Sequence, residues 1–371
     1  MKLYIIAGEA SGDLHGSNLI RAIRAQKQDV EFRCWGGDLM EQQGAKLVKH
    51  YRDLAFMGFL EVILNIRTIF KNLTFCKKDI ESCAPDAVIL IDYPGFNLHI
   101  ATWAAKNGIK VFYYISPQIW AWKENRVHQI KRDIDKMFVV LPFEKEFYKK
   151  YDMEVTFVGH PLLDVISSRQ KNVLKFVEEN NLLQKPVIAL LPGSRKQEIS
   201  TMLPLMLSVK NEFPDHQFVV AGAPGQDASF YDQFLQTADV KLIFGRTYDL
   251  LLNAEAGLIT SGTATLEAGL FRLPQVVCYK GSQASYQIAK RLIKIKYISL
   301  VNLILDKPAV KELIQNELTK KNITSELRAL LQSPERRKEM TSDYDNLHNQ
   351  LGGAGASERT ATAMLKILAE N

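Results

Sequence analysis

Short apolar runs rich in β-branched residues alternate with longer amphipathic segments through the first half of the 371-residue chain. Runs of this length, separated by helix-length segments, are typical of βα units in a parallel, doubly wound sheet. We expect helices such as 14–26, 98–107 and 143–151 between the runs. The expected strands are 3–7, 30–35, 87–91, 110–115, 137–141 and 155–158.

A second series of the same kind follows, and the segment Gly-His-Pro at 159–161 separates the two series. Beyond residue 308 the pattern predicts helices only. We therefore expect a Rossmann-like domain over residues 1–161, a second over 162–345, and a C-terminal helix over 346–371. Two such domains facing each other across a cleft bring the loops of both sheets to one site. The expected strands of the second series are 187–191, 217–221, 240–243, 257–259 and 276–279.

Residues 54–78 carry an unusual number of bulky apolar side chains. They recur at alternating spacings of three and four, which is one stripe of an α-helix, and basic residues lie on the other side. This pattern fits a helix that dips into a membrane surface. A long helix covering the sheet, the more frequent arrangement, has the same pattern. The stripe consists of Phe56, Phe59, Ile63, Ile66, Phe70 and Leu73.

The composition is that of a soluble globular protein, with 47% hydrophobic and 24% charged residues. The net charge of +6 is too small to argue for nucleic acid, although it suits an anionic substrate or anionic lipid. The four cysteines have neither metal-ligand nor Cys-x-x-Cys spacing, which favours reduced thiols in a cytoplasmic protein. No signal peptide and no charge-free apolar stretch of about 18 residues stands out, so we expect no transmembrane helix.

Residues 257–269 read G-L-I-T-S-G-T-A-T-L-E-A-G. An apolar run ends at Ser261 and Gly262, and a helix pattern begins at Thr263. A strand, a small-residue turn and a helix leave backbone N–H groups free at the positive end of the helix, which is a seat for a phosphate or diphosphate. Glu267, about one turn further on, can accept two hydrogen bonds from a ribose diol. The segment predicts a nucleotide site, although an ordinary N-cap turn has the same spacing.

The loop after the first expected strand reads G-E-A-S-G-D. Gly8 and Gly12 allow a ligand to approach the backbone closely, and Glu9 and Ser11 lie between them. The loop lacks the G-x-G-x-x-G spacing, which argues against a nicotinamide dinucleotide. A tight turn between a strand and a helix is an equal alternative.

Asp92 follows the expected strand 87–91. A carboxylate at the carboxyl end of a central strand faces the ligand crevice of an open α/β sheet, where desolvation raises its pKa as a general base requires. The alternative is that Asp92 only caps the next helix. After the next strand come Trp120, Trp122 and Arg126, which suit an acyl or sugar surface and an anionic headgroup. Ordinary packing and a solvated helix face are the alternatives for these three residues.

The motif L-P-G-S-R ends at Arg195, whose planar guanidinium can bind a diphosphate through two hydrogen bonds. Glu312 and Gln315 stand three residues apart, a spacing that places them on one helix face, where they either clasp a nucleotide or face solvent. Two Asp-x-Asp pairs, at 133–135 and 343–345, match the motif of metal-dependent sugar transferases in residue pattern but not in position. The first precedes its strand and the second falls in the terminal helices, so we expect no metal. The helix N-terminus and Arg195 must then meet the charge of a departing diphosphate.

Together these stretches resemble the lipid-A-disaccharide synthases, a family of bacterial glycosyltransferases with the GT-B architecture. The matches follow the family's order over nearly the whole chain, which makes the resemblance specific although no single motif is. The matching stretches are G-E-A-S-G-D (8–13), M-G-F-L-E-V (57–62), I-D-Y-P-G-F-N (91–97), S-P-Q-I-W-A-W (116–122), L-P-F-E-K-E-F-Y (141–148), G-H-P (159–161), L-P-G-S-R (191–195), S-G-T-A-T-L-E (261–267) and S-L-V-N (299–302).

The resemblance implies transfer of 2,3-diacylglucosamine from UDP to 2,3-diacylglucosamine 1-phosphate, which forms the β-1',6-linked lipid A disaccharide and releases UDP. The family works at the cytoplasmic face of the inner membrane of Gram-negative bacteria and needs no NAD, so we expect no cofactor. Domain 1–161 then serves the acceptor and the membrane, and domain 162–345 binds the UDP-sugar. In this family the C-terminal helices return to the first domain or exchange within a homodimer, and the glycine-rich break at 352–355 permits either.

Residue by residue, the resemblance implies that Asp92 is essential and acts as the base, and that Arg195 and Asn302 lie near UDP. The sequence departs from the family pattern at two positions. Gly95 stands where relatives often have a second acidic residue, so Asp92 acts alone in its loop, and Val301 replaces a frequent proline.

Other classes of protein fit parts of the pattern. A UDP-sugar epimerase, or another UDP-sugar-dependent GT-B transferase, shares the fold and the donor seat. An epimerase needs neither a lipid acceptor nor the apolar stripe. A membrane-bound nucleotide sensor needs the seat but no base at Asp92. Release of UDP on mixing two acylated glucosamines separates the synthase from the epimerase and the sensor.

Overall fold

The structure is a computed structural model of the chain, and it describes residues 1–54, 66–166, 169–236, 239–281 and 296–370. The chain forms two compact units. The first consists of Met1–Asp164 and Leu351–Asn371, and the second of Val165–Gln350. The changes of unit thus fall a few residues beyond 161 and 345, where the sequence places its boundaries.

The first unit is built on a seven-stranded parallel sheet with the strand order β3-β2-β1-β4-β5-β6-β7. The chain winds outward from β1 in one direction and from β4 in the other, so the switch point lies between these two strands. All five residues of β4 are buried, as expected for a central strand covered on both faces. The strands are β1 Lys2–Ala7, β2 Glu31–Gly36, β3 Lys46–His50, β4 Ala87–Ile91, β5 Lys110–Tyr114, β6 Lys136–Val139 and β7 Thr156–Phe157.

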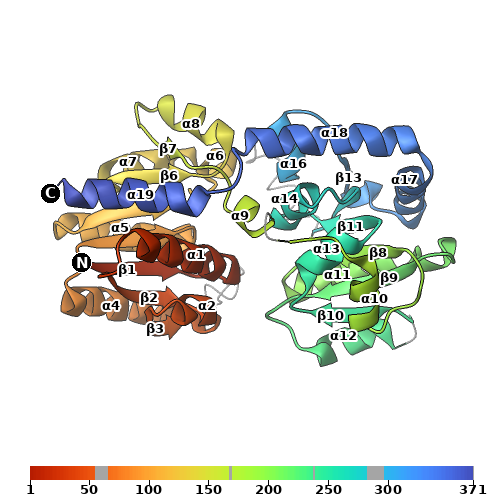
Figure 1. Cartoon of the computed structure of the whole chain (residues 1–371), viewed down its shortest axis with the longest axis horizontal. Coiled ribbons are helices and arrows are strands. Elements are labelled where there is room, and N and C mark those ends of the chain that lie inside the picture. The colour runs from red at the N-terminus through yellow and green to blue at the C-terminus, as the bar shows by residue number, and fades with distance from the viewer. Residues whose placement is uncertain (55–65, 167–168, 237–238, 282–295, 371) are drawn as a thin grey trace. The chain divides into compact units, whose positions relative to one another are not determined.

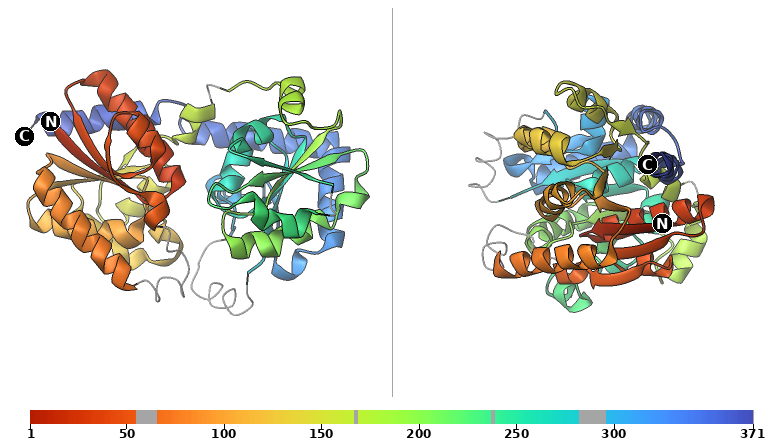
Figure 2. Two further views of the ribbon diagram at one scale, coloured as in Figure 1. Left: turned by 90° about the horizontal axis from the view of Figure 1, so that it is seen from below. Right: turned by 90° about the vertical axis from the view of Figure 1, so that its left-hand side faces the viewer.

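Helices cover both faces of this sheet, as Figures 1 and 2 show. Leu73, Cys76 and Ile80 of α4 contribute to the hydrophobic core on one face. The helices are α1 Ala10–Gln26, α2 Asp38–Gln42, α4 Ile66–Cys83, α5 Pro94–Lys106, α6 Ile119–Trp122, α7 Val127–Asp133, α8 Pro142–Lys149, α9 Leu162–Ile166 and α19 Ala356–Ala369, with the 3-10 turns η1 Tyr51–Leu54 and η2 Glu124–Arg126.

The C-terminal helix α19 packs along α1 of its own chain (Figure 1). Asp164 accepts hydrogen bonds from three backbone N–H groups at the start of α19, at 2.5 to 3.2 Å, and so caps the helix. Arg359 Nε donates to the carbonyl of Val158 at 2.8 Å. The helix therefore belongs to the first unit, one of the two positions that the sequence allows.

The second unit is built on a six-stranded parallel sheet with the order β10-β9-β8-β11-β12-β13, whose switch point lies between β8 and β11. Its strands are β8 Val187–Leu191, β9 Gln217–Gly222, β10 Lys241–Phe244, β11 Ala256–Thr260, β12 Gln275–Tyr279 and β13 Lys311–Ile314. Its helices are α10 Val173–Glu179, α11 Lys196–Leu207, α12 Ala228–Leu235, α13 Thr247–Asn253, α14 Thr263–Leu270, α16 Leu300–Leu305, α17 Lys320–Gln332 and α18 Pro334–Gln350, with the turns η3 Lys210–Glu212 and η4 Gln315–Glu317.

The predicted fold class, two Rossmann-like α/β domains on parallel sheets with C-terminal helices, is confirmed. The sequence pattern does not predict two of the strands, β3 and β13. Because β13 lies beyond residue 308, the expectation of helices only in that region is wrong. Both strands lie at a sheet edge and contain charged residues, a feature that keeps edge strands from pairing with other chains. Such a short run, with few consecutive apolar residues, gives a weak strand signal.

Candidate functional site

The loops after β1 and β4 begin side by side at the switch point of the first sheet. Ala7 at the end of β1 is the register partner of Ile91 at the end of β4. A Cβ atom on Gly8 would lie 2.3 Å from the ring of Tyr93, so this contact requires a glycine. The topology thus brings the predicted residues Gly8, Glu9 and Asp92 to one edge of the sheet, where α/β proteins bind ligands.

The backbone at Asp92 is held in an uncommon conformation. Asp92 and Tyr93 have φ angles of 44° and 50°, in the left-handed region that strains residues other than glycine. The carbonyl oxygen of Asp92 accepts hydrogen bonds from the Tyr113 hydroxyl at 2.5 Å and from Asn97 Nδ2 at 2.7 Å. These two side chains lock the turn. The sequence carries a signal for Asn97, which ends the motif I-D-Y-P-G-F-N, but none for Tyr113.

The surroundings of Asp92 favour its neutral form. Burial, and then the negative charge of Glu9, raise the pKa of Asp92 from 3.8 to about 7, while a backbone hydrogen bond at Tyr93 lowers it. A carboxylate with this pKa is poised to take a proton near neutral pH. The capping alternative does not hold, because Tyr93 is the N-cap of α5 and no side chain caps that helix.

The rest of the G-E-A-S-G-D motif divides between the surface and the interior. Ser11 is exposed, whereas Gly12 is buried, and a Cβ atom there would lie 3.0 Å from that of Ala7. The Asp13 carboxylate accepts hydrogen bonds from the backbone N–H groups of residues 37, 39 and 40, at 2.8 to 3.1 Å. Asp13 therefore fixes the start of α2, and only the first part of the motif remains for a ligand.

The loop after β5 holds the predicted tryptophans. The Trp120 ring meets Phe143 edge-on, with 4.9 Å between centroids, which supports ordinary packing for this residue. Trp122 ends the short helix α6, and Arg126 is partly buried in η2. Because Ile91 and Tyr114 are register partners, the loop follows a strand adjacent to that of Asp92.

Glu144 lies beneath this loop and is not singled out by the sequence pattern. Its Oε2 accepts hydrogen bonds from the N–H groups of Val140 at 3.2 Å and Leu141 at 2.9 Å. Burial raises the pKa of Glu144 to about 7, and the hydrogen bonds from the backbone of Leu141 and Val140 lower it. Glu144 therefore fixes the turn between β6 and the start of α8.

In the second unit the loops after β8 and β11 also begin side by side, because Leu191 is the register partner of Ile259. Gly262 is the exposed N-cap of α14 with φ 153°, and a Cβ atom there would meet nothing within 4 Å. Thr263 is exposed as well, so the start of α14 is open to solvent. The Ser261 hydroxyl donates to the carbonyl of Ile298 at 2.9 Å and so braces the turn.

Arg195 stands at the N-cap of α11, in the loop on the other side of this switch point. Its side chain is 58% exposed, and its guanidinium lies 3.9 Å from the Glu198 carboxylate. Glu198 Oε2 also accepts from the N–H groups of Ser194 and Arg195, at 3.2 and 3.4 Å. The turn is thus fixed, while the exposed guanidinium can still reach an anion beside α14.

Glu267 lies one turn into α14 and is partly buried. The Tyr248 hydroxyl of α13 donates to its Oε1 at 3.1 Å. Burial raises the pKa of Glu267, and the hydrogen bond from Tyr248 lowers it. The structure therefore groups Arg195, Ser261, Gly262, Thr263 and Glu267 at one edge of the second sheet.

Asn302, Glu312 and Gln315 form hydrogen bonds within the second unit, close to the same edge of its sheet. The prediction that Glu312 and Gln315 share a helix is wrong, because Glu312 is in β13 and Gln315 in η4. The Asn302 amide bonds both backbone groups of Val310 and donates to Glu312 at 2.9 Å. Glu312 also accepts from the N–H groups of residues 298 and 299. Asn302 and Glu312 thus hold the segment that braces Ser261, and they border a hollow of about 580 Å³.

Gln315 supports the end of β12. With its amide oriented to satisfy both groups, it donates to the carbonyl of Gly281 and accepts from the N–H of Gly281, at 3.2 Å each. Its side chain is buried, and its φ of 51° lies in the left-handed region. These contacts use one of the two N–H donors and one of the two acceptor positions of the amide.

The apolar stripe does not form one uniform face where the structure describes it. Leu73 is 7% exposed and packs in the core of the first unit, whereas Phe70 is 62% exposed. Residues 66–78 of this segment lie in α4, Ile66–Cys83, and residues 55–65 lie outside the described residues. Phe56, Phe59, Ile63 and the side chain of Ile66 lie outside the described part of the chain.

Both Asp-x-Asp pairs are used in structural contacts. Asp133 bonds Arg132 and Thr102, Asp135 accepts from the N–H of Val111, and Asp343 pairs with Lys307. Within the described ranges no cluster of three or more His, Cys, Asp or Glu side chains is arranged to hold a metal.

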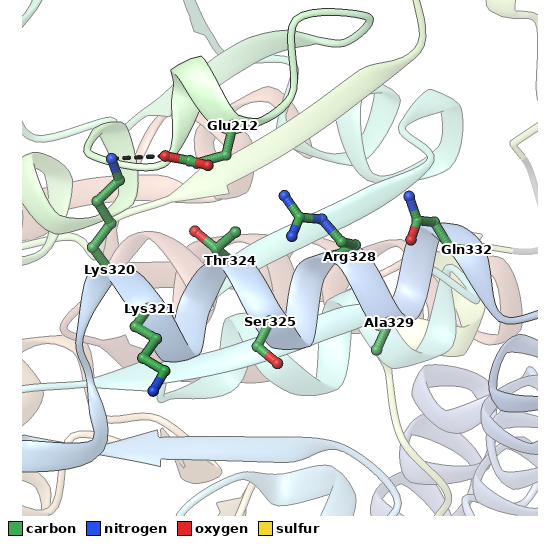
Figure 3. A pocket seen from close by; sticks show the side chains of 8 residues that line it. All are labelled: Glu212, Lys320, Lys321, Thr324, Ser325, Arg328, Ala329 and Gln332. Atoms are coloured by element: carbon green, nitrogen blue, oxygen red, sulfur yellow. Dashed lines mark ion pairs between the residues drawn. The ribbon is translucent and has the colours of Figure 1, made fainter.

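Figure 3 shows a hollow of about 730 Å³ along α17 that contains none of the predicted site residues. Its most prominent contact is the ion pair between Lys320 Nζ and Glu212 Oε1 at 2.8 Å. The exposed Arg328 lies 5.9 Å from the centre of the Phe213 ring. The side chains around this hollow come from Glu212, Lys320, Lys321, Thr324, Ser325, Arg328, Ala329 and Gln332.

Comparison with known proteins identifies the family to which this chain belongs. The family model described as lipid-A-disaccharide synthetase matches residues 3–367. The lipid-A-disaccharide synthase of Syntrophus aciditrophicus (strain SB) is 41% identical over 374 residues, covering 98% of this chain and 97% of that protein. The chain belongs to the lipid-A-disaccharide synthase family. As a member it is an enzyme, a glycosyltransferase.

Solved structures share the fold at low sequence identity. The glycotransferase of kitacinnamycin matches with a TM-score of 0.64 and 14% identity, covering 99% of each chain. UDP-GlcNAc 2-epimerase from Neisseria meningitidis, solved with UDP-GlcNAc, matches with a TM-score of 0.67 and 15% identity, covering 99% of this chain and 100% of that one. This second likeness concerns the fold alone, so the family match decides against the epimerase alternative. Among the described residues, no helix has both the length and the apolar character to span a membrane.

Proposed function

We propose that the chain transfers a diacylated glucosamine from UDP to a diacylated glucosamine 1-phosphate and releases the lipid A disaccharide and UDP. The observation that carries this proposal is the full-length family match together with a strained, partly buried carboxylate at a switch point. The acyl groups of both sugars follow from the family, not from any groove among the described residues.

The donor is proposed to bind at the edge of the second unit that Arg195 and Gly262 border. The diphosphate sits on the first turn of α14, where the helix N-terminus favours negative charge. Arg195 adds two forked N–H donors, and Glu267 accepts from the ribose diol. Asn302, Glu312 and Gln315 act behind this seat, through the contacts described above. We propose that no metal or other cofactor takes part, because the helix terminus and Arg195 supply the positive charge that a departing diphosphate needs.

The acceptor is proposed to bind at the edge of the first unit, near Gly8, Glu9 and the loop of Trp120 and Arg126. Forming a β-bond from an α-linked UDP-sugar inverts the anomeric carbon, so the acceptor's 6-hydroxyl attacks it directly. Asp92 takes the hydroxyl proton while the new C–O bond forms, and the electron pair of the breaking bond leaves with UDP. A positioned base contributes about 10²–10⁴-fold to such a step.

The enzyme is proposed to work at the cytoplasmic surface of the inner membrane, where both lipid substrates lie. The exposed Phe70 on α4, next to the basic Lys71, suits the interface between headgroups and acyl chains. A homodimer with exchanged C-terminal helices is proposed from the family resemblance alone. In the structure α19 lies on its own first unit.

Binding of UDP tests the proposed donor seat before any lipid chemistry. Calorimetry on the whole chain should show one UDP site per chain, with inorganic phosphate as a weak competitor. If UDP does not bind at millimolar concentration, the donor seat and the proposed function both fall. If UDP binds but is never released from an acylated UDP-glucosamine in the presence of the acceptor, the site is a nucleotide sensor.

A further inference from the structure

The hydrogen bond between Tyr248 and Glu267 joins α13 to α14 beside the donor seat. It is 3.1 Å long, and the Tyr248 ring packs against Phe271 with 5.3 Å between centroids. No Lys or Arg in the part of the chain that the structure describes forms an ion pair with Glu267. A partly buried carboxylate with one neutral donor is under-satisfied, because an ionised carboxylate offers about four acceptor positions. Glu267 thus has acceptor capacity left for a ligand.

Tyr248 is itself held in place from a second direction. The Arg169 guanidinium lies 5.3 Å from the centre of the Tyr248 ring, a cation–π contact. Arg169 also pairs with Asp249 at 2.6 Å, and Asp249 pairs with Arg246 at 3.0 Å. These contacts hold the Tyr248 ring in place more firmly than the packing of a partly exposed tyrosine requires.

The protonation state of Tyr248 suits a donor. Burial and the carboxylate of Glu267 raise the pKa of Tyr248 well above its ordinary value, against an opposing effect of Arg169. The hydroxyl therefore keeps its proton at neutral pH and donates it to Glu267. One oxygen of the carboxylate is then fixed in direction, which removes side-chain freedom before a ligand arrives.

We infer that Tyr248 is a positioning residue that holds the Glu267 carboxylate for the ribose diol of the nucleotide. The inference rests on the proposed donor seat. Arg169 and Asp249 act one step further out, by holding the Tyr248 ring. None of these three residues touches the reacting atoms, so they set how tightly and how selectively the nucleotide binds.

The experiment compares UDP with 2'-deoxy-UDP, which lacks one of the two ribose hydroxyls. Calorimetry on the wild-type chain should show UDP binding at least about tenfold tighter, the effect of one hydrogen bond to a charged group. Tyr248→Phe should reduce this preference at least about threefold. It should also raise the KM for the UDP-sugar while kcat changes less than about twofold. Glu267→Gln, as a reference, should abolish the preference.

Tyr231→Phe is a matched control in the same unit. The Tyr231 hydroxyl accepts from the N–H of Ala223 at 2.9 Å and lies in another part of the sheet edge. Its loss should lower the melting temperature but leave the preference for UDP unchanged. The inference is overturned if Tyr248→Phe keeps the wild-type preference, or if Tyr231→Phe changes it as much. If the wild-type chain binds both nucleotides equally, the inference falls while the seat stands, and if it binds neither, both fall.

Discussion

Replacing Asp92 with asparagine should abolish turnover and at the same time stabilise the protein at alkaline pH. The carboxyl pKa in the folded chain is about 7, against 3.8 ordinarily. Because the folded pKa is the higher one, ionising Asp92 costs the folded state free energy as pH rises from about 4 to about 7. At about 1.36 kcal/mol per pKa unit, the full cost above pH 7 is at most about 4 kcal/mol. Asparagine stays neutral and avoids this cost.

The assay compares melting temperatures of the two proteins at pH 8 and at pH 4. The variant should melt several degrees higher at pH 8. The difference should become small at pH 4, which is close to the ordinary carboxyl pKa of 3.8, because the free-energy cost of keeping Asp92 neutral in the folded state has barely begun there. Asp152→Asn is the matched control, because Asp152 is exposed and shares the left-handed backbone with φ 50°. It reports the preference of asparagine for that conformation alone.

The same variant tests the chemistry. Turnover should fall by at least about a hundredfold with UDP binding intact, because the proton acceptor is lost and the shape is kept. A variant that melts no higher at pH 8 than the Asp152→Asn control explains would refute the electrostatic reasoning. Turnover within tenfold of wild type in a folded variant would show that Asp92 is not the base.

Three further perturbations test separate parts of the site. Glu9→Gln removes the second-largest cause of the raised pKa of Asp92, so the acid limb of the kcat/KM profile should move to lower pH, while burial, the larger cause, still holds that pKa above its ordinary value. An unmoved limb would mean that Glu9 does not face the base. Arg195→Ala should weaken UDP binding by about 1.5–3 kcal/mol in calorimetry, whereas Arg328→Ala, at another exposed arginine of the same unit, should leave it unchanged. Phe70→Ser should reduce binding to anionic vesicles about tenfold without lowering the melting temperature, and Leu174→Ser, at a side chain that is 73% exposed in the other unit, should do neither. A large loss of stability in the Phe70 variant would instead assign that side chain to the core.

The central strands could be predicted from the sequence because they are buried on both faces. Ala87–Ile91 and Val187–Leu191 are continuous apolar runs, and their predicted bounds are those of β4 and β8. The edge strands β3 and β13 could not, since both are short and contain charged residues. Because the sequence does not predict β13, the prediction that Glu312 and Gln315 share a helix is wrong. A spacing of three residues also fits a strand that leads into a turn.

The grouping of site residues could be predicted where it follows from topology, as for Asp92 beside Gly8. The side chains that hold the site residues in place could not be predicted. Tyr113 supports Asp92 from the neighbouring strand, and Tyr248 reaches Glu267 from another helix. Such contacts join distant positions in the chain and leave no local spacing in the sequence. Phe70 and Leu73 of the apolar stripe differ in burial. This difference could not be predicted, because periodicity alone does not show where the buried face of a helix ends.

The most direct test of the proposed reaction is the product itself. The purified chain is incubated with UDP-2,3-diacylglucosamine and 2,3-diacylglucosamine 1-phosphate, and the lipid fraction is analysed by mass spectrometry and by the NMR coupling of the new anomeric proton. We predict a β-linked disaccharide monophosphate, formed in equal amount to UDP and only when both substrates are present. An epimerised UDP-sugar with no disaccharide, or UDP release that does not need the acceptor, would contradict the account.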